Sequence, residues 1–147
     1  MPAELTTDPR VARVIAAFES LRPGDVARLA ELYTEEARFK DPFNEVQGHA
    51  ALRRVFEHMF ASLEEPRFVV TEALVQGERC FLVWRFLFRF RRWSREPQEV
   101  RGGSYLVFAP DGRIALHRDY WDAAEELYEK LPGLGSVMRW LRRRAMA

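Results

Sequence analysis

Apolar residues recur every three or four positions before Pro66 and at every second position after it. The first spacing predicts helices with one buried face, and the second predicts strands with one buried face. Before Pro66 the pattern predicts three helices, at residues 8–21, 25–33 and 49–63. A short strand over 37–41, which ends at Pro42, separates the second helix from the third.

The second half of the chain predicts an antiparallel sheet. Four strand candidates follow one another and are joined by short turns: 68–76, 79–93, 99–109 and 113–122. Short turns between consecutive strands are typical of an antiparallel meander. Asp122 then begins a fourth helix as its N-cap, and a last helix begins at Leu134. We therefore expect an α+β domain in which three N-terminal helices pack on a curved antiparallel sheet, followed by a helical tail.

Two of these strands carry side chains that suit a pocket. One face of the strand 79–93 is an apolar, largely aromatic row of Leu82, Trp84, Phe86, Phe88 and Phe90. One face of the last strand carries Ala115, His117, Asp119 and Trp121. A histidine, a carboxylate and an indole on one face fit either a pocket or a solvent-exposed sheet edge, and this stretch alone favours neither.

Composition narrows the class of protein. The 147 residues have the size of one domain, and 11 Phe and 4 Trp favour a large apolar interior or a lined cavity. A formal net charge of +1 gives no reason to expect nucleic acid or a membrane as partner. The lone Cys80, and a start without the pattern of a signal peptide, predict a cytoplasmic protein. The histidines show no metal-ligand spacing and no cofactor motif is present, so we expect neither metal nor cofactor.

Four short segments, in this order and spacing, carry a family resemblance: Gly24-Asp25, 33–42 (YTEEARFKDP), 48–53 (GHAALR) and 108–113 (FAPDGR). Over about residues 8–122 the chain resembles the nuclear-transport-factor-2-like (NTF2-like) superfamily, in its SnoaL-like and ketosteroid-isomerase-like branch. The resemblance implies a cone-shaped fold over 1–122, with a helical extension over 123–147 that we expect to pack on it. Relatives mostly pair through the outer face of the sheet, which implies a homodimer here through Arg85, Leu87, Tyr105 and Val107.

The resemblance also points to individual residues. Asp41 matches the general-base aspartate of ketosteroid isomerases, which also precedes a proline. The other polar positions of that site correspond to Ala17 or Phe18, to Ser104 and to Phe56. Those residues lack the required acidic and phenolic groups, so the steroid-isomerase mechanism does not carry over.

The last strand gains a role from the same resemblance. Its pocket-facing positions correspond to His117, Asp119 and Trp121. SnoaL-like cyclases have a catalytic aspartate in this neighbourhood, which matches either Asp119 or Asp122. An apolar surrounding disfavours the charged form of a carboxylate and makes it a plausible base near neutral pH.

Two hypotheses follow. In the first, Asp41, His117 and Asp119 form an acid–base cluster of an isomerase, cyclase or hydrolase that acts on a hydrophobic small molecule. Its ligand-binding walls would be Trp84, Phe86, Phe56, Trp121, Ser104, Phe18 and His58. In the second, the domain binds a hydrophobic ligand without catalysis or serves as an accessory domain; Asp41 then caps the turn before Pro42, and His117 and Asp119 are a structural polar pair. The sequence leaves open whether any reaction is catalysed.

The basic tail has two interpretations of its own. Trp140 and Leu141 lie among four arginines, a composition that fits a helix on a membrane surface. Most amphipathic helices instead pack on their own protein, which is the prediction we keep for this tail.

Overall fold

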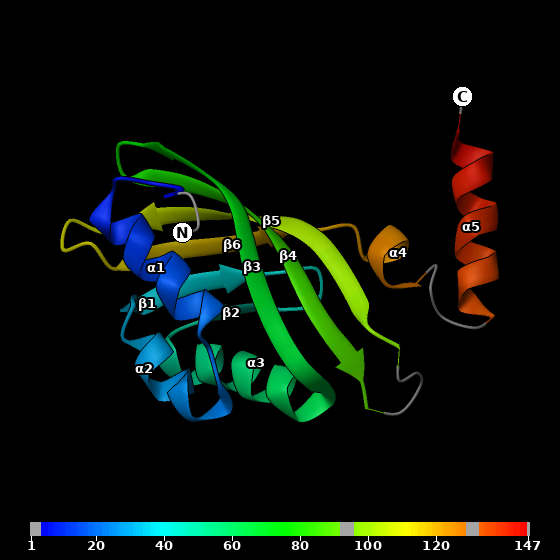
Figure 1. Ribbon diagram of the computed structural model, residues 1–147, viewed down its shortest axis with the longest axis horizontal. Helices are drawn as coiled ribbons and strands as arrows, with labels where there is room; N and C mark the ends of the chain where they lie inside the picture. Colours follow the sequence, from blue (N-terminus) through cyan, green and yellow to red (C-terminus); the bar gives the residue numbers. More distant parts are fainter. Residues whose placement is uncertain (1–3, 92–95, 129–132, 147) are drawn as a thin grey trace.

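The computed structural model describes residues 4–91, 96–128 and 133–146. A long curved sheet and the helices α1, α2 and α3 enclose one apolar core (Figure 1). The elements in chain order are α1 (Pro9–Glu19), the 3-10 turn η1 (Pro23–Asp25), α2 (Val26–Ala30), β1 (Tyr33–Lys40), β2 (Glu45–Gln47), α3 (His49–Ser62), β3 (Leu63–Gln76), β4 (Arg79–Phe90), β5 (Gln98–Phe108), β6 (Ile114–Tyr120), α4 (Ala123–Glu126) and α5 (Leu134–Ala145). The predicted α+β class with a curved sheet is confirmed.

The sheet has six strands in the order β2-β1-β6-β5-β4-β3. Its neighbours are antiparallel except for β1 and β6, which run parallel. The sequence pattern misses β2 and assigns Tyr33 to a helix, whereas Tyr33 opens β1 opposite Ile114. The Ile114 N–H also donates to the Leu32 carbonyl at 2.8 Å. Pairing with a strand from the far end of the domain thus replaces the last turn of the predicted helix.

Strand β3 begins earlier than the pattern predicts. It starts at Leu63, directly after α3, and contains Pro66. Proline has no N–H for the ladder, but β3 lies at the edge of the sheet, where proline is tolerated. The register shifts between Glu64 and Arg67, and Glu65 has a φ of 50°. This irregularity accommodates the proline without ending the strand. The last residues of the predicted strand 79–93 lie outside the described residues.

The core lies between the helices and the inner face of the sheet. It joins apolar side chains of α1 and α3 to the alternate residues of β4 that the sequence pattern groups together. The large side chains that are almost completely buried are Tyr33, Leu106, Ile114, Val11 and Val14. Strict alternation along the last strand would place Ile114 on the face opposite His117 and Asp119. Ile114 is nevertheless buried in the core, and the register between β5 and β6 shifts next to it, between Val107 and Phe108.

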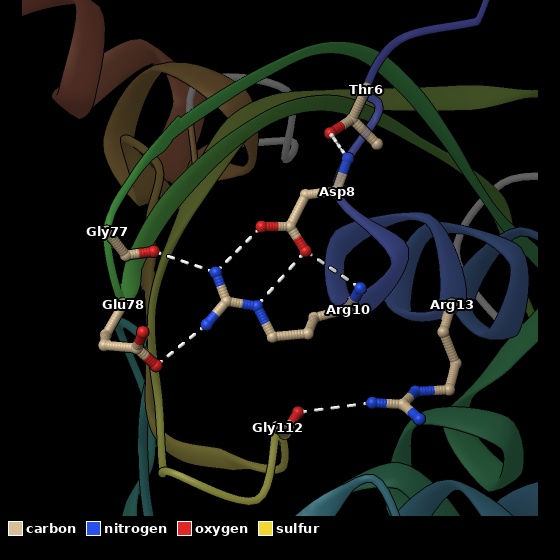
Figure 2. A network of polar contacts seen from close by, with 7 residues as sticks. All are labelled: Thr6, Asp8, Arg10, Arg13, Gly77, Glu78 and Gly112. Carbon is tan, nitrogen blue, oxygen red and sulfur yellow. Dashed lines mark hydrogen bonds and ion pairs between the residues drawn. The ribbon is translucent and has the colours of Figure 1, made fainter.

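Arg10 ties the start of α1 to the turns at one end of the sheet (Figure 2). Its guanidinium group donates to both carboxylate oxygens of Asp8, to Glu78 at 2.8 Å and to the Gly77 carbonyl at 2.8 Å. The same group lies 4.8 Å from the centre of the Phe108 ring, a cation–π contact. Asp8 in turn caps α1 by accepting the Arg10 N–H at 2.9 Å. The first helix is therefore held against the β3–β4 turn by its second residue.

The C-terminal elements begin as predicted. Asp122 caps α4 by accepting the Glu125 N–H at 3.1 Å. Helix α5 stands apart from the sheet in Figure 1, and its side chains Val137, Trp140 and Leu141 are 46–51% exposed. The packing of residues 123–147 on the domain therefore stays a prediction. Within the described part of the chain, no helix combines the length and the apolar character needed to cross a membrane.

The paired carboxylate of Asp8 predicts a change of stability in acid. The hydrogen bond from Arg10 lowers the pKa of Asp8 from 3.8 to about 2. A carboxyl group whose pKa is lowered by folding stabilises the fold above its unfolded pKa, and this contribution is lost as the pH falls toward the folded pKa. We expect Asp8→Asn, which keeps an N-cap acceptor but removes the charge, to lower the thermal unfolding midpoint at neutral pH and to have little effect at about pH 2. An equal loss at both pH values would contradict this.

Candidate functional site

A continuous chain of hydrogen bonds crosses the inner face of the sheet. The Tyr33 hydroxyl lies 2.7 Å from Nδ1 of His117, and Nε2 of His117 lies 2.6 Å from Oδ1 of Asp119. The same Oδ1 accepts a hydrogen bond from Ser104 Oγ at 2.5 Å. Ser104 Oγ accepts from the Trp84 indole N–H at 2.8 Å. Side chains from β1, β6, β5 and β4 are thus linked by hydrogen bonds through one carboxylate oxygen.

The protons of the Ser104 arm follow from the chemistry of its members. An indole N–H only donates, so Ser104 has to accept from Trp84. The serine hydroxyl then keeps its own hydrogen for Asp119, whose ionised carboxylate only accepts. Both hydrogen bonds therefore run toward Asp119. Trp84 and Ser104 are each 5% exposed, so neither polar group depends on bulk water for a partner.

Strand geometry brings these residues together. Alternation along β6 sets His117 and Asp119 on one face, as the sequence pattern predicts. In the antiparallel register Ser104 lies opposite Asp119 and Leu106 lies opposite His117. Trp84 lies opposite Gly102, two residues before Ser104 along β5, and so faces the same side.

Gly102 makes room for the indole of Trp84. A Cβ at this position would lie 2.6 Å from Cη2 of Trp84 and 2.9 Å from Cβ of Trp121. Distances this short are far inside van der Waals contact, so any side chain at Gly102 would force the Trp84 indole or the adjacent chain at 120–121 to shift. The lack of a side chain at Gly102 is thus needed for the packing of the site.

The predicted site residues line two cavities under the sheet. The larger has a volume of about 240 Å³ and is lined by seven of them: Asp41, Phe56, His58, Trp84, Phe86, Asp119 and Trp121. The smaller, of about 30 Å³, adds the other three, which are Phe18, Ser104 and His117. Asp119, Trp84 and Phe56 line both cavities. The predicted set therefore surrounds one region of the molecule, while its functional roles stay predictions.

Asp119 combines a fixed oxygen with access to the larger cavity. Its side chain is 17% exposed, whereas that of His117 is 4% exposed. Within residues 4–91, 96–128 and 133–146, the hydrogen bonds to this carboxylate all go to Oδ1. Oδ2 has no partner of that kind. Asp122, the other candidate for a catalytic aspartate, caps α4 and lines neither cavity.

Asp41 lies in the wall of the larger cavity but is held by its own turn. Its Oδ1 accepts the backbone N–H groups of Phe43 at 2.8 Å and of Asn44 at 2.6 Å. The Asn44 side-chain amide lies 3.2 Å from both carboxylate oxygens. These donors hold the Asp41 carboxylate within its own turn. The geometry therefore favours the turn-capping role for Asp41, which is the second interpretation from the sequence.

Other polar and aromatic groups border the larger cavity. His58 and Ser62, one turn apart on α3, lie 3.3 Å apart between Nε2 and Oγ, and both are exposed. Trp121 makes an edge-on contact with the exposed Phe43, with ring centres 5.5 Å apart. Apart from Asp41, Asn44, His58, Ser62 and Asp119, the wall is apolar.

The sequence pattern misses Tyr33, whose hydroxyl completes the polar chain. Tyr33 is completely buried, and burial raises the pKa of its phenol well above 10, an effect increased by the charge of Asp119. Phe39 and Phe68, which line the larger cavity, are missed as well. In the sequence, Tyr33 is the last apolar residue of a helical pattern and is followed by Thr-Glu-Glu. Nothing in this local pattern indicates that its partner is His117, 84 positions away.

The described part of the chain contains no group of three or more His, Cys, Asp and Glu side chains arranged to hold a metal ion. Both ring nitrogens of His117 are already in hydrogen bonds, one with Tyr33 and one with Asp119.

Comparison with known proteins identifies the family of the chain. The family model of the SnoaL-like domain matches residues 11–117, which is most of the chain. The chain therefore belongs to the SnoaL-like family, and its fold is that of the NTF2-like superfamily. No curated protein sequence matches it significantly.

Solved structures share this fold at low sequence identity. A ketosteroid-isomerase-like hypothetical protein from Catenulispora acidiphila, in complex with trimethylamine, has a TM-score of 0.72 at 18% identity, covering 83% of this chain and 92% of its own. TerC, co-crystallised with polyporic acid, has a TM-score of 0.70 at 16% identity, covering 80% and 95%. SalBIII is an epoxide hydrolase/cyclase-like enzyme with a role in pyran ring formation in the polyether salinomycin. It has a TM-score of 0.66 at 20% identity, covering 77% of this chain and 88% of its own.

The contact across Gly102 yields a test of the packing around the site. We expect Gly102→Ala to destabilise the fold by about 1–3 kcal/mol in urea unfolding, because the new methyl group overlaps the indole of Trp84. Gly24→Ala is the matched control, since a Cβ added at Gly24 would meet nothing within 4 Å and this glycine has no positive φ. Equal stability of the two variants would show that Gly102 is not needed for this packing.

Proposed function

We propose that the domain binds an apolar, ring-containing small molecule in the larger cavity, and that Asp119 removes a proton from it as a general base. The observation that carries this proposal is the arrangement of the Asp119 carboxylate. Two donors hold Oδ1, whereas Oδ2 has no hydrogen bond within the described residues and the side chain borders the cavity.

The physical chemistry of the wall supports a base at this position. A largely apolar wall beside Asp119 lets an apolar ligand replace the water next to the carboxylate. The hydrogen bonds from His117 and Ser104 keep the group in one orientation without occupying the second oxygen. A base that is fixed within reach of its proton is the geometric requirement for general base catalysis. In this proposal His117 and Ser104 position the base, and the reaction itself takes place at Asp119.

The size of the cavity supports a small ligand. Its volume of about 240 Å³ lies between the roughly 150 Å³ of a cavity that accepts benzene and the roughly 300 Å³ at which drug-sized pockets begin. A molecule of one or two fused rings fits this range. The wall offers Trp84, Phe86 and Phe88 for contacts with the faces and edges of such rings.

The fold relatives support the same class of chemistry without fixing the reaction. SalBIII is an epoxide hydrolase/cyclase-like enzyme, and TerC was crystallised with an organic acid. Isomerisation, cyclisation and hydrolysis each include removal of a proton from a C–H or O–H group. Proton removal by Asp119 is common to all of these.

Opening of 5-nitrobenzisoxazole tests the base directly. This two-ring molecule loses the proton of its C–H group to a base while its N–O bond breaks, and the product, 2-cyano-4-nitrophenolate, is coloured. We expect the protein to accelerate the reaction above the rate with acetate, and Asp119→Asn to lower the protein-catalysed rate by about a hundredfold or more.

Two matched variants make this outcome specific. Asp122→Asn removes a nearby carboxylate that lines neither cavity, and we expect it to keep the rate. Asp41→Asn distinguishes the two aspartates of the wall. A loss in Asp41→Asn but not in Asp119→Asn would assign the base to Asp41. Binding of the probe without any acceleration would instead support the alternative function, a non-catalytic domain that binds hydrophobic ligands.

The homodimer through the outer face of the sheet stays a prediction. Leu87, Tyr105 and Val107 are partly exposed on that face, and Arg85 pairs there with Glu99 at 2.6 Å. We expect twice the monomer mass in light scattering at micromolar concentration, and a monomeric mass would contradict the prediction.

A further inference from the structure

The hydroxyl proton of Tyr33 lies next to His117, and its position bears on which hydrogen-bonding groups Asp119 and its neighbours can offer to a ligand. The Tyr33 hydroxyl is completely buried, and its partner is Nδ1 of His117 at 2.7 Å. The phenol keeps its proton, because burial and the negative charge of Asp119 both raise the pKa of Tyr33. Within the described residues this hydroxyl has no other hydrogen-bond partner. Tyr33 therefore donates to Nδ1.

The state of His117 follows from this donor. A neutral imidazole carries one N–H, and a nitrogen that accepts a hydrogen bond cannot carry it. With Nδ1 accepting from Tyr33, the N–H is on Nε2 and points at Oδ1 of Asp119, 2.6 Å away. The other rings against the imidazole are those of Phe18 and Phe39, with centres 5.8 and 4.8 Å from it, and neither offers a competing polar group.

Every donor of the polar chain is then already in use. The Trp84 N–H donates to Ser104. The Ser104 O–H and the His117 Nε2–H both donate to Oδ1 of Asp119. What remains at this end of the cavity is the Oδ2 oxygen of a carboxylate. An ionised carboxylate oxygen accepts hydrogen bonds and cannot donate.

We propose that Tyr33, acting through the tautomer of His117, makes this end of the cavity a pure hydrogen-bond acceptor, so that the site selects apolar ring molecules bearing a hydroxyl group over their ethers and ketones. The proposal rests on the proposed function in one respect, namely that the ligand meets Asp119. A hydroxyl donates to Oδ2 in a charge-assisted hydrogen bond, whereas an ether or ketone oxygen brings a lone pair against a negative charge. Tyr33 is a positioning residue in this scheme, and it touches no ligand.

Nitrogen-15 NMR of the imidazole side chains tests the proton positions without any ligand. In the unmodified protein at neutral pH, we expect His117 to show a protonated Nε2 and an unprotonated, hydrogen-bonded Nδ1. A proton on Nδ1, alone or with one on Nε2, would overturn the proposal. This measurement does not depend on catalysis, so it separates a failure of this inference from a failure of the proposed function.

Binding of two matched probes tests the selection. 2-Naphthol and 2-methoxynaphthalene share one ring system, but only the first donates a hydrogen bond, and both are followed by fluorescence. We expect the protein to bind 2-naphthol about tenfold or more tightly than 2-methoxynaphthalene, the range of a hydrogen bond to a charged group. In Asp119→Asn we expect this preference to be lost, because the amide can turn an N–H toward the cavity. Equal affinities for the two probes in the unmodified protein would overturn the selection.

The Tyr33→Phe variant tests the link between the buried proton and the ligand. Without the phenol, Nδ1 no longer accepts a hydrogen bond, so the imidazole can take up one proton from solvent at Nδ1. The imidazolium that results keeps its Nε2–H on Asp119 and offsets the charge of that carboxylate. We expect a share of Nδ1–H in the NMR spectrum and a smaller preference for 2-naphthol, with thermal unfolding as the control for folding. An unchanged preference in a folded Tyr33→Phe protein would remove Tyr33 from the scheme. If this variant does not fold, the spectrum and the probe preference of the unmodified protein still decide the proposal.

Discussion

The Oδ1 oxygen of Asp119 is the point on which the polar interior of this protein depends. It receives the hydrogen bonds of Ser104 and His117, and these two residues are in turn the partners of the Trp84 indole and the Tyr33 phenol. A buried polar group without a partner costs about 1–3 kcal/mol, and loss of this oxygen would leave the donors of both Ser104 and His117 unpaired. The described residues contain no buried side-chain nitrogen or oxygen without a partner. The chemistry proposed for Asp119 uses its other oxygen, Oδ2, which has no hydrogen bond within the described residues.

The fold explains why such a network faces a cavity. The strands β4, β5 and β6 present alternate residues to the same side, and their register sets the polar residues of β5 and β6 beside the aromatic row of β4. Large rings pack against one another here, as in the contact between Phe68 and Phe86, with ring centres 4.6 Å apart. The same rings then form the wall of the larger cavity. In the proposed function, polar specificity is concentrated at Asp119, and the surrounding aromatic groups provide apolar contact area.

Much of this arrangement could be predicted from the sequence because it depends on local periodicity. Alternation alone groups His117, Asp119 and Trp121, and it groups the aromatic residues of β4. What could not be predicted depends on contacts between distant segments. Tyr33 joins the site only because β1 runs parallel to β6, a pairing that no spacing within either segment reveals. The turn at Asp41 is similar: a carboxylate before proline fits a base or a cap equally well, and only the positions of the Phe43 and Asn44 N–H groups favour the cap.

The central claim is that Asp119 presents a free carboxylate oxygen to a ligand in the larger cavity. A crystal structure of the protein with 2-naphthol tests it most directly. We expect the naphthol ring to lie among Trp84, Phe86 and Phe88, with its hydroxyl oxygen about 2.5–2.7 Å from Oδ2 of Asp119, the range of a hydrogen bond to a carboxylate. A ring bound in this cavity with its hydroxyl directed at Asn44 or His58, or a ligand bound elsewhere on the protein, would contradict it.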